Sequence, residues 1–155
     1  MPQTKSIKPP IEVRVSPIHG TGAFASRSLK PGQVIGCYAG RRYSAEEVGL
    51  REWDHAVTFV FGLSDGSVLD GAEGGNATRH INHSCAPNCV AYEIESEDGP
   101  NWIQIETLGK IAAGEELFLD YGLAVEGSLP EDFPCRCGAA ACRGSLVAPP
   151  RLASA

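Results

Sequence analysis

Glycine and proline occur so often along this chain that many turns and few long helices are expected. The 155 residues include 18 glycines and 11 prolines, which separate short runs of β-branched and aromatic residues. Glycine weakens the interiors of helices and strands, and proline removes a backbone donor from them. The pattern predicts a mostly β fold of many short strands and little helix, with one turn-rich stretch at 19–22. The length suits a single domain with one modest core.

Alternation and turn residues place the expected elements. Val13 and Val15 alternate with charged residues and predict a strand, and residues 34–38 predict another after a Pro-Gly turn. Ser44 and Glu47 have the spacing of a capping box, which predicts a short helix to about residue 52. Two hairpins are expected, one pairing 56–63 with 67–69 and the other pairing 90–95 with 102–106.

The charge balance favours a basic protein partner over nucleic acid. Thirteen Lys and Arg against 19 Asp and Glu give a formal net charge of −6. Such a surface repels the phosphate backbone and suits a Lys-rich tail, although it also simply aids solubility. No apolar run approaches the roughly 20 residues of a membrane span, and the N-terminus lacks the apolar core of a signal peptide. We therefore expect no membrane association and an intracellular protein, in cytoplasm or nucleus, with export into a host left open.

Three cysteines near the C-terminus form a cluster with metal-ligand spacing. Cys135, Cys137 and Cys142 lie among glycine and alanine, where they add little to an apolar core. Zinc takes four tetrahedral ligands, usually thiolates, at about 2.3 Å. The cluster predicts a zinc site that lacks one local ligand, and a group of reduced or redox-sensitive thiols is the alternative.

Three other cysteines are candidates for the fourth ligand. Cys37 lies within a predicted apolar strand, so we expect it to be a core thiol. Cys89 follows a Pro-Asn turn and is placed at the start of the next strand. Cys85 lies in a loop from which its side chain can reach another segment, and it is the favoured fourth ligand.

Several motifs occur together in one order along the chain. Residues 79–89 read RHINHSCAPNC, residues 114–122 read GEELFLDYG, and residues 135–144 carry the cysteine cluster followed by Arg-Gly. Weaker matches are GTGAFA at 20–25 and YAG at 38–40. Together these segments resemble the SET-domain protein-lysine methyltransferases with a post-SET segment. A lone G-x-G is weak evidence, whereas the first two motifs together are very specific.

This resemblance implies a fold and a division of the chain. It covers roughly residues 11–145, without a cysteine-rich pre-SET segment, as in a minimal enzyme. The family's fold is mostly β, a β-clip of several small twisted sheets with a C-terminal pseudo-knot and a zinc-bound post-SET segment. The expected division is a flexible arm at 1–10, the SET domain at 11–125, the zinc segment at 126–145 and a flexible tail at 146–155.

The resemblance also implies roles for single residues. Tyr121 matches the catalytic tyrosine, whose hydroxyl orients the transferring methyl group. Tyr38 matches a tyrosine that shapes the lysine channel, with a buried core tyrosine as the alternative. The residues expected to bind the cofactor S-adenosylmethionine are His19, Gly20, Thr21, Gly22, Arg79, Asn82, His83, Phe133 and Arg136, where Arg79 either supports the cofactor carboxylate or braces the knot. The channel is expected to include Phe59 and Leu119, and one structural zinc ion is expected on Cys85, Cys135, Cys137 and Cys142.

The expected function is methyl transfer to a lysine of a histone or other basic protein. Leu119 stands where relatives often carry Phe or Tyr, and its lack of a hydroxyl favours di- or trimethylation. Two departures from the family pattern are Arg41, where Glu is common, and His80, where Phe is usual; the first can alter peptide contacts and the second the pH response. The alternative function is a catalytically weak, zinc-stabilised module that binds Lys-rich tails.

Overall fold

The computed structural model describes residues 9–17, 20–50, 60–120, 135, 137, 139–140, 142 and 144. These residues form ten short strands, one α-helix and one 3-10 helix. The strands are β1 (Ile11–Val15), β2 (Thr21–Ala25), β3 (Val34–Tyr38), β4 (Arg41–Tyr43), β5 (Val60–Gly62), β6 (Val68–Asp70), β7 (Asn82–His83), β8 (Cys89–Ile94), β9 (Trp102–Thr107) and β10 (Phe118–Leu119). The helices are α1 (Ala45–Leu50) and η1 (Ala77–His80). None of the helices described here is long and apolar enough to cross a bilayer.

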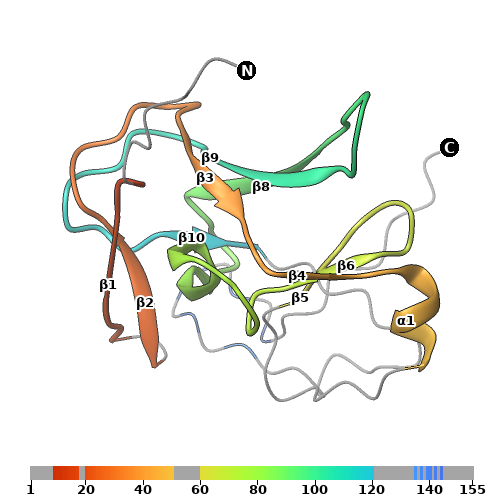
Figure 1. The fold of residues 1–155 in the computed structure, drawn as a ribbon. Coiled ribbons are helices and arrows are strands. Elements are labelled where there is room, and N and C mark those ends of the chain that lie inside the picture. The colour runs from red at the N-terminus through yellow and green to blue at the C-terminus, as the bar shows by residue number, and fades with distance from the viewer. Residues whose placement is uncertain are drawn as a thin grey trace, which may run out of the picture.

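The described strands pair into four small sheets (Figure 1). β1 and β2 form a ribbon, and two three-stranded antiparallel sheets have the orders β3-β9-β8 and β4-β6-β5. The fourth sheet pairs β10 with β7 in parallel, although the two strands are more than thirty residues apart in the sequence. The predicted mostly β fold of several small sheets with little helix is confirmed.

Local sequence signals located most of the longer elements. β3 occupies residues 34–38 as predicted, and β8 pairs with β9 in the expected hairpin. The capping box forms: the Glu47 N–H donates to Ser44 Oγ at 3.2 Å, and the Ser44 N–H donates to Glu47 Oε1 at 3.4 Å. α1 begins immediately after Ser44, where a polar N-cap side chain satisfies a free N–H of the first turn.

The predicted turn at 19–22 is shorter than expected. Thr21 and Gly22 already belong to β2, which pairs with β1 from Val15↔Thr21 onward. Gly20 has a positive φ, of 46°, and therefore ends the turn. The sequence suggested a loop because both glycines resemble turn residues, whereas strand pairing fixes Gly22 in extended backbone.

The expectation that Cys37 is a core thiol is wrong, because its side chain is exposed. A register shift between Val34 and Gly36 interrupts the pairing of β3 with β9. Such an irregularity inserts a residue and reverses which face the later side chains occupy. Ile35 and Tyr38 both face the core as a result, and Cys37 lies on the outer face opposite Gln104.

The core lies between the sheets and fixes the elements of the site. Ile81 after η1, Leu117 before β10 and Ile105 in β9 are almost fully buried. Burial of a side chain of this size contributes about 1.5–3 kcal/mol. Leu29, Ile35 and Ile111 are also almost fully buried. The strands β7 and β10 therefore rest on packed aliphatic residues that adjoin them in the sequence.

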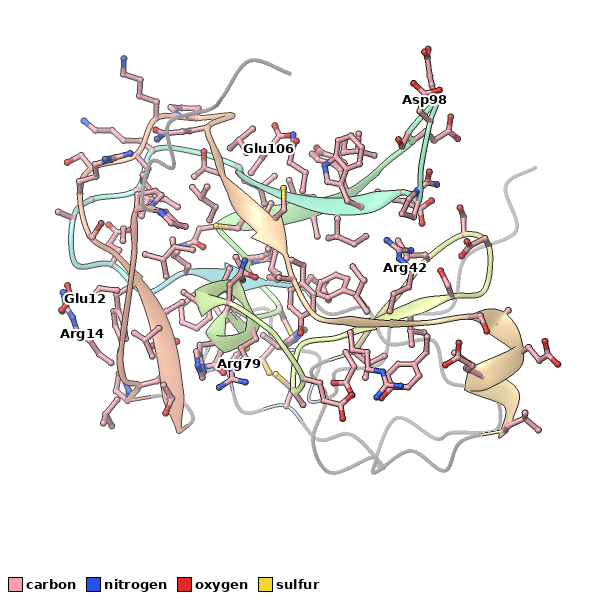
Figure 2. The ribbon with its side chains drawn as sticks, viewed as in Figure 1. Glu12, Arg14, Arg42, Arg79, Asp98 and Glu106 are labelled. Carbon is pink, nitrogen blue, oxygen red and sulfur yellow. The ribbon has the colours of Figure 1, made fainter. Side chains whose placement is uncertain are left out.

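Polar contacts join the two three-stranded sheets. Glu93 of β8 accepts hydrogen bonds from the backbone N–H of Ser64 at 2.6 Å and from its hydroxyl at 2.5 Å. The Ser64 hydroxyl is the main reason that the pKa of Glu93 is lowered. Arg42 of β4 donates to the carbonyl oxygen of Asn101, and Figure 2 shows this side chain reaching toward the β8–β9 hairpin, whose tip carries Asp98.

Candidate functional site

The two most specific motifs of the sequence meet through the parallel pairing of β7 and β10. Asn82 lies opposite Phe118, and His83 lies opposite Leu119. The Ser84 N–H donates to the Leu119 carbonyl oxygen at 3.0 Å and extends the contact. His83 is buried, and its Nδ1 lies 3.7 Å from Asp120 Oδ1. The backbone therefore places Asn82 and His83 beside the residues that lead directly to Tyr121.

The Asn88 side chain also holds the paired strands β7 and β10, which we call the strand crossing. Its Nδ2 donates to the Glu116 carbonyl oxygen at 2.8 Å, and its Oδ1 accepts from the Phe118 N–H at 2.8 Å. One side-chain amide thus satisfies a donor and an acceptor of a strand that has few backbone partners of its own. Asn88 was not predicted as a site residue, although its place in the motif at 79–89 was a usable signal.

Asn82 connects the crossing to the start of β2. Its Nδ2 donates to the Thr21 carbonyl oxygen at 3.2 Å. Gly22 leaves no room for a side chain, because a Cβ there would lie 2.9 Å from Ser16 Cβ and 3.1 Å from Glu116 Cδ. Thr21, Gly22 and Asn82, which were predicted to bind the cofactor, are therefore in one place. Sequence reasoning missed the contributions of Ser16 and Glu116.

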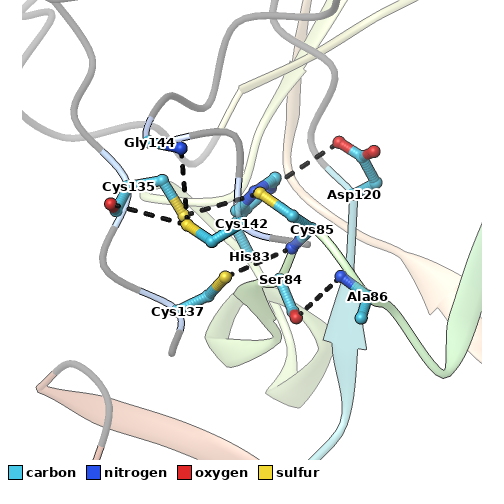
Figure 3. Close-up of polar contacts among 9 residues, drawn as sticks. All are labelled: His83, Ser84, Cys85, Ala86, Asp120, Cys135, Cys137, Cys142 and Gly144. Carbon is cyan, nitrogen blue, oxygen red and sulfur yellow. Dashed lines mark hydrogen bonds and ion pairs between the residues drawn. The ribbon is translucent and has the colours of Figure 1, made fainter. Parts of the chain in front are cut away.

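The four predicted metal ligands also converge (Figure 3). The sulfur atoms of Cys85, Cys135, Cys137 and Cys142 all lie within 4.8 Å of one another. Cys85 Sγ is 3.9 Å from Cys135 Sγ, and the Cys85 N–H donates to Cys137 Sγ at 3.4 Å. Two backbone hydrogen bonds hold the chain near the sulfurs, from Cys135 N to Gly144 O and from Cys142 N to Ala139 O.

This donor set fits a zinc ion. Four thiolates at about 2.3 Å around a tetrahedral ion lie about 3.8 Å from one another, close to the 3.9 Å between Cys85 Sγ and Cys135 Sγ. Four sulfur ligands without a carboxylate favour zinc over the hard cations calcium and magnesium. The group can therefore hold a metal ion of this kind with small adjustments of the side chains.

Hydrogen bonding prepares one of these thiols for ionisation. Burial raises the pKa of Cys137, but hydrogen bonds from the backbone N–H groups of Cys85 and Ala139 and contacts with the neighbouring thiols outweigh it and lower the pKa to about 6. Burial raises the pKa of Cys135. A thiol whose pKa is lowered in this way is suited to capturing a cation, which would then favour ionisation of the other thiols.

His83 connects the metal group to the strand crossing. Its Nε2 lies 3.3 Å from Cys85 Sγ, and Figure 3 shows the ring between Cys85 and Asp120. The imidazole is only 3% exposed, and its two nitrogens face a sulfur on one side and a carboxylate on the other. This position explains why a histidine follows Asn82 without requiring that it act as a base.

Tyr38 and Leu119 form buried apolar parts of the structure near the crossing. Tyr38 is 6% exposed, packs against Phe61 with ring centroids 4.5 Å apart and leaves no room for a side chain at Gly71. Leu119 is 3% exposed. Both positions are compatible with the wall of a narrow channel and with ordinary core packing.

Arg79 and His80 lie at the end of η1. Arg79 donates from Nη1 to the Gly71 carbonyl oxygen at 3.3 Å and from Nε to His80 Nε2 at 3.2 Å. Burial, together with the charge of Arg79, lowers the pKa of His80. Arg79 thus links η1 to Gly71, and the lowered pKa of His80 suits its ring to accepting the hydrogen bond from Arg79.

Five predicted site residues lie outside the described part of the chain. They are His19, Phe59, Tyr121, Phe133 and Arg136. Gly20 is described, with a positive φ and open space around it.

Comparison with known proteins identifies the family. A family model described as the SET domain matches residues 20–122. An H3 lysine-4 specific histone-lysine N-methyltransferase of Neurospora crassa is 36% identical over 149 residues, which cover 93% of this chain and 11% of that protein. Human histone-lysine N-methyltransferase 2B is 36% identical over 146 residues, which cover 92% of this chain and 5% of that protein. The chain therefore spans a small part of the length of these relatives.

Solved structures agree with the sequence relatives. A structure of ctPRC2 in an autoinhibited conformation, bound to S-adenosylmethionine, superposes with a TM-score of 0.66 at 29% identity, covering 72% of this chain and 15% of that one. A humanized mutant of Chaetomium thermophilum Polycomb Repressive Complex 2 has a TM-score of 0.64 at 30% identity, with the same coverage of both chains. With its small sheets, its paired motifs and a family match over most of its length, this chain belongs to the SET domain family.

Proposed function

We propose that this chain is a protein-lysine methyltransferase that uses S-adenosylmethionine to methylate a histone or another Lys-rich protein. The observation that carries the proposal is the β7–β10 pairing, which brings Asn82 and His83 beside the strand that leads to Asp120, next to Tyr121. The methyltransferase names of the relatives and the net charge of −6 support a basic protein substrate. Such a substrate would place the protein inside a cell.

The residues present fit the cofactor. The backbone at Gly20 is open, because no atom of the described residues lies within 4 Å of an added Cβ, and the Asn82 amide donates to the adjoining Thr21 carbonyl oxygen. When bound, S-adenosylmethionine supplies a methyl group on a sulfonium that is already a good leaving group. The protein then has to align the lysine nitrogen with the methyl group and exclude water. In the proposal the segment 20–22, Arg79, Asn82 and His83 hold the cofactor, with His19, Phe133 and Arg136 beside them.

Tyr121 and the channel residues complete the proposed mechanism. The Tyr121 hydroxyl orients the methyl group, while Tyr38, Phe59 and Leu119 line the channel that admits a neutral lysine side chain. Leu119 has no hydroxyl to hold a water molecule in the channel, which favours di- or trimethyl-lysine as product. Mass spectrometry of a peptide with enzyme in excess tests this point, and monomethyl-lysine as the only product would contradict it.

The same proposal assigns the four cysteines to a structural zinc ion and divides the chain as the resemblance implies. The ion would be held by Cys85, Cys135, Cys137 and Cys142. It would order the zinc segment at 126–145, which follows the SET domain at 11–125 in the sequence. The pseudo-knot and the flexible ends at 1–10 and 146–155 stay predictions, because most of these residues and all of 121–134 lie outside the described part of the chain.

A radiolabel transfer experiment tests the function. Purified, zinc-supplied protein is mixed with labelled S-adenosylmethionine and with core histones, a basic DNA-packaging protein and a cell lysate, beside Tyr121→Phe. We expect label on lysine that falls by at least about a hundredfold in the variant. Cofactor binding by calorimetry without label on any substrate would favour the module that binds Lys-rich tails, and absence of cofactor binding would contradict the proposal.

A further inference from the structure

Glu116 is the residue at which three separate segments of the site meet. Its backbone bridges to Phe24 of β2, and its carbonyl oxygen accepts from Asn88. These two contacts fix the backbone of Glu116, and therefore the position from which its side chain extends. The carboxylate then extends to Ser16, before the turn, and to Asn82, after η1.

Both carboxylate oxygens have a partner. Ser16, which is 7% exposed, donates from its hydroxyl to Glu116 Oε1 at 2.6 Å. Asn82 Nδ2 lies 3.5 Å from Glu116 Oε2 while it donates to the Thr21 carbonyl oxygen at 3.2 Å. A half-buried carboxylate that accepts a short hydrogen bond holds its partner firmly, because charge-assisted hydrogen bonds are stronger than neutral ones.

Glu116 also explains why residue 22 is glycine. A Cβ at position 22 would lie 3.1 Å from both Cδ and Oε1 of Glu116, and 2.9 Å from Ser16 Cβ. The φ of Gly22 is not in the left-handed region, so backbone conformation does not require glycine there. The carboxylate therefore packs directly against the β2 backbone at Gly22, and Ser16, just after β1, is hydrogen-bonded to the same side chain.

We propose that Glu116 is a positioning residue for the cofactor: its carboxylate holds Ser16, the start of β2 at Thr21 and Gly22, and the Asn82 amide in the arrangement that binds S-adenosylmethionine. The inference rests on the proposed function, which assigns the segment 20–22 and Asn82 to that cofactor. Glu116 acts through these groups and takes no part in the transfer itself. Its loss therefore weakens binding of the cofactor more than it slows the step with cofactor bound.

Glu116→Gln tests the inference, with Glu115→Gln as the matched control. The control changes the same residue type one position earlier, where the side chain is exposed. Calorimetry measures Kd for S-adenosylmethionine and for S-adenosylhomocysteine, which lacks the sulfonium charge. We expect both Kd values to rise about tenfold in Glu116→Gln and in Ser16→Ala, equivalent to about 1.4 kcal/mol. In Glu115→Gln we expect both to stay within about twofold of the original protein.

Kinetics distinguish positioning from other roles. With saturating cofactor, kcat of Glu116→Gln should recover to within about threefold of the original value while KM for the cofactor stays raised. A lower melting temperature with unchanged Kd would overturn the inference in favour of a structural role. A loss confined to S-adenosylmethionine would overturn it in favour of a direct contact with the sulfonium.

Asn82→Ala separates failure of this inference from failure of the proposed function. If the original protein binds the cofactor and Asn82→Ala weakens binding while Glu116→Gln and Ser16→Ala do not, only the role of Glu116 is wrong. If the original protein does not bind the cofactor, the proposed function itself is wrong.

Discussion

The two halves of the site, the strand crossing and the cysteine group, are held by different kinds of interaction. At the crossing, β7 and β10 pair through their backbones, and Asn88 supplies a donor and an acceptor at 2.8 Å. At the cysteine group, the contacts from Cys85 to Cys135 and Cys137 run through sulfur, at 3.9 Å and 3.4 Å. Thiol contacts of this length are weak compared with a ladder hydrogen bond.

This difference indicates which half of the site keeps its structure before any ligand binds. The crossing lies on the buried aliphatic residues Ile81 and Leu117, and backbone and amide hydrogen bonds within the protein hold it. Around the cysteine group the backbone hydrogen bonds of the described residues are local ones, at Cys135 and Cys142, and the contacts that join Cys85 to the other cysteines run through sulfur, so a cation would strongly favour the close approach of the four sulfurs. We therefore expect the crossing to be stable by itself and the cysteine half to depend on a metal ion.

Metal removal should give the largest effect and should affect one half only. A chelator, or Cys137→Ser, is expected to lower the zinc content from one ion per chain to none. Loss of the ion should destabilise the zinc segment by several kcal/mol, roughly half or less of the 10–16 kcal/mol by which zinc binds isolated zinc-finger peptides. Metal analysis and hydrogen exchange measure the two effects. Protection at β7 and β10 should persist.

Cys37→Ser is the control for metal removal, because Cys37 is exposed on the outer face of β3 and lies outside the group. It should keep its zinc. Equal loss of zinc in both variants, or loss of protection at β7 and β10 together with the zinc segment, would show that the two halves are not organised separately.

Asn88→Ala should damage the other half. It leaves the Phe118 N–H and the Glu116 carbonyl oxygen without the Asn88 partner, at an expected cost of about 2–3 kcal/mol in the free energy of unfolding. Asn88→Asp keeps an acceptor for Phe118 but points a carboxylate oxygen at the Glu116 carbonyl oxygen, so it should not recover the lost stability. Urea unfolding measures both variants, with zinc content expected to stay unchanged; original stability in Asn88→Asp would show that the hydrogen bond to Glu116 contributes nothing.

Gly20→Ala should have a smaller effect on the crossing. Gly20 has φ of 46°, and no atom of the described residues lies within 4 Å of the position that an added Cβ would take, so the cost is backbone strain of about 1 kcal/mol. Gly49→Ala is the control, since it lies in α1 with equally open space and should be neutral or stabilising. Thermal unfolding compares the two, and equal shifts would argue against strain at Gly20.

His80→Phe should have the smallest effect, and one that depends on pH. Burial, with the charge of Arg79, lowers the pKa of His80 below its ordinary value of 6.5, so the unfolded chain binds the proton more readily. Stability linked to His80 is therefore complete above pH 6.5 and falls as the pH drops through the lowered value, by less than about 1 kcal/mol at this partly exposed site. Unfolding measured from about pH 7.5 to about pH 5 should show this loss in the original protein and a flatter profile in His80→Phe.

The sequence predicted the elements whose signals are local. The capping box at Ser44 and the hairpin of β8 and β9 occur where expected, because side chains near in sequence specify them. The short strands β4, β7 and β10 were not predicted as strands, since two or three residues carry little propensity and are strands only through their partners. Cys37 was placed in the core for a similar reason: the irregularity that turns it outward depends on the pairing of β3 with β9.

The sequence by itself determined the chemistry available to this protein: the motifs at 79–89 and 114–122, the glycine-containing stretch at 19–22, and a tail with three cysteines. Only the tertiary structure decided which of these groups meet. It brings Cys85, rather than Cys37 or Cys89, to the three cysteines of the zinc segment. It also places the Glu116 carboxylate between Ser16 and Asn82. Residue types and local spacing fix the donors, whereas contacts across a hundred residues of sequence arise only when the core packs and the strands choose their partners.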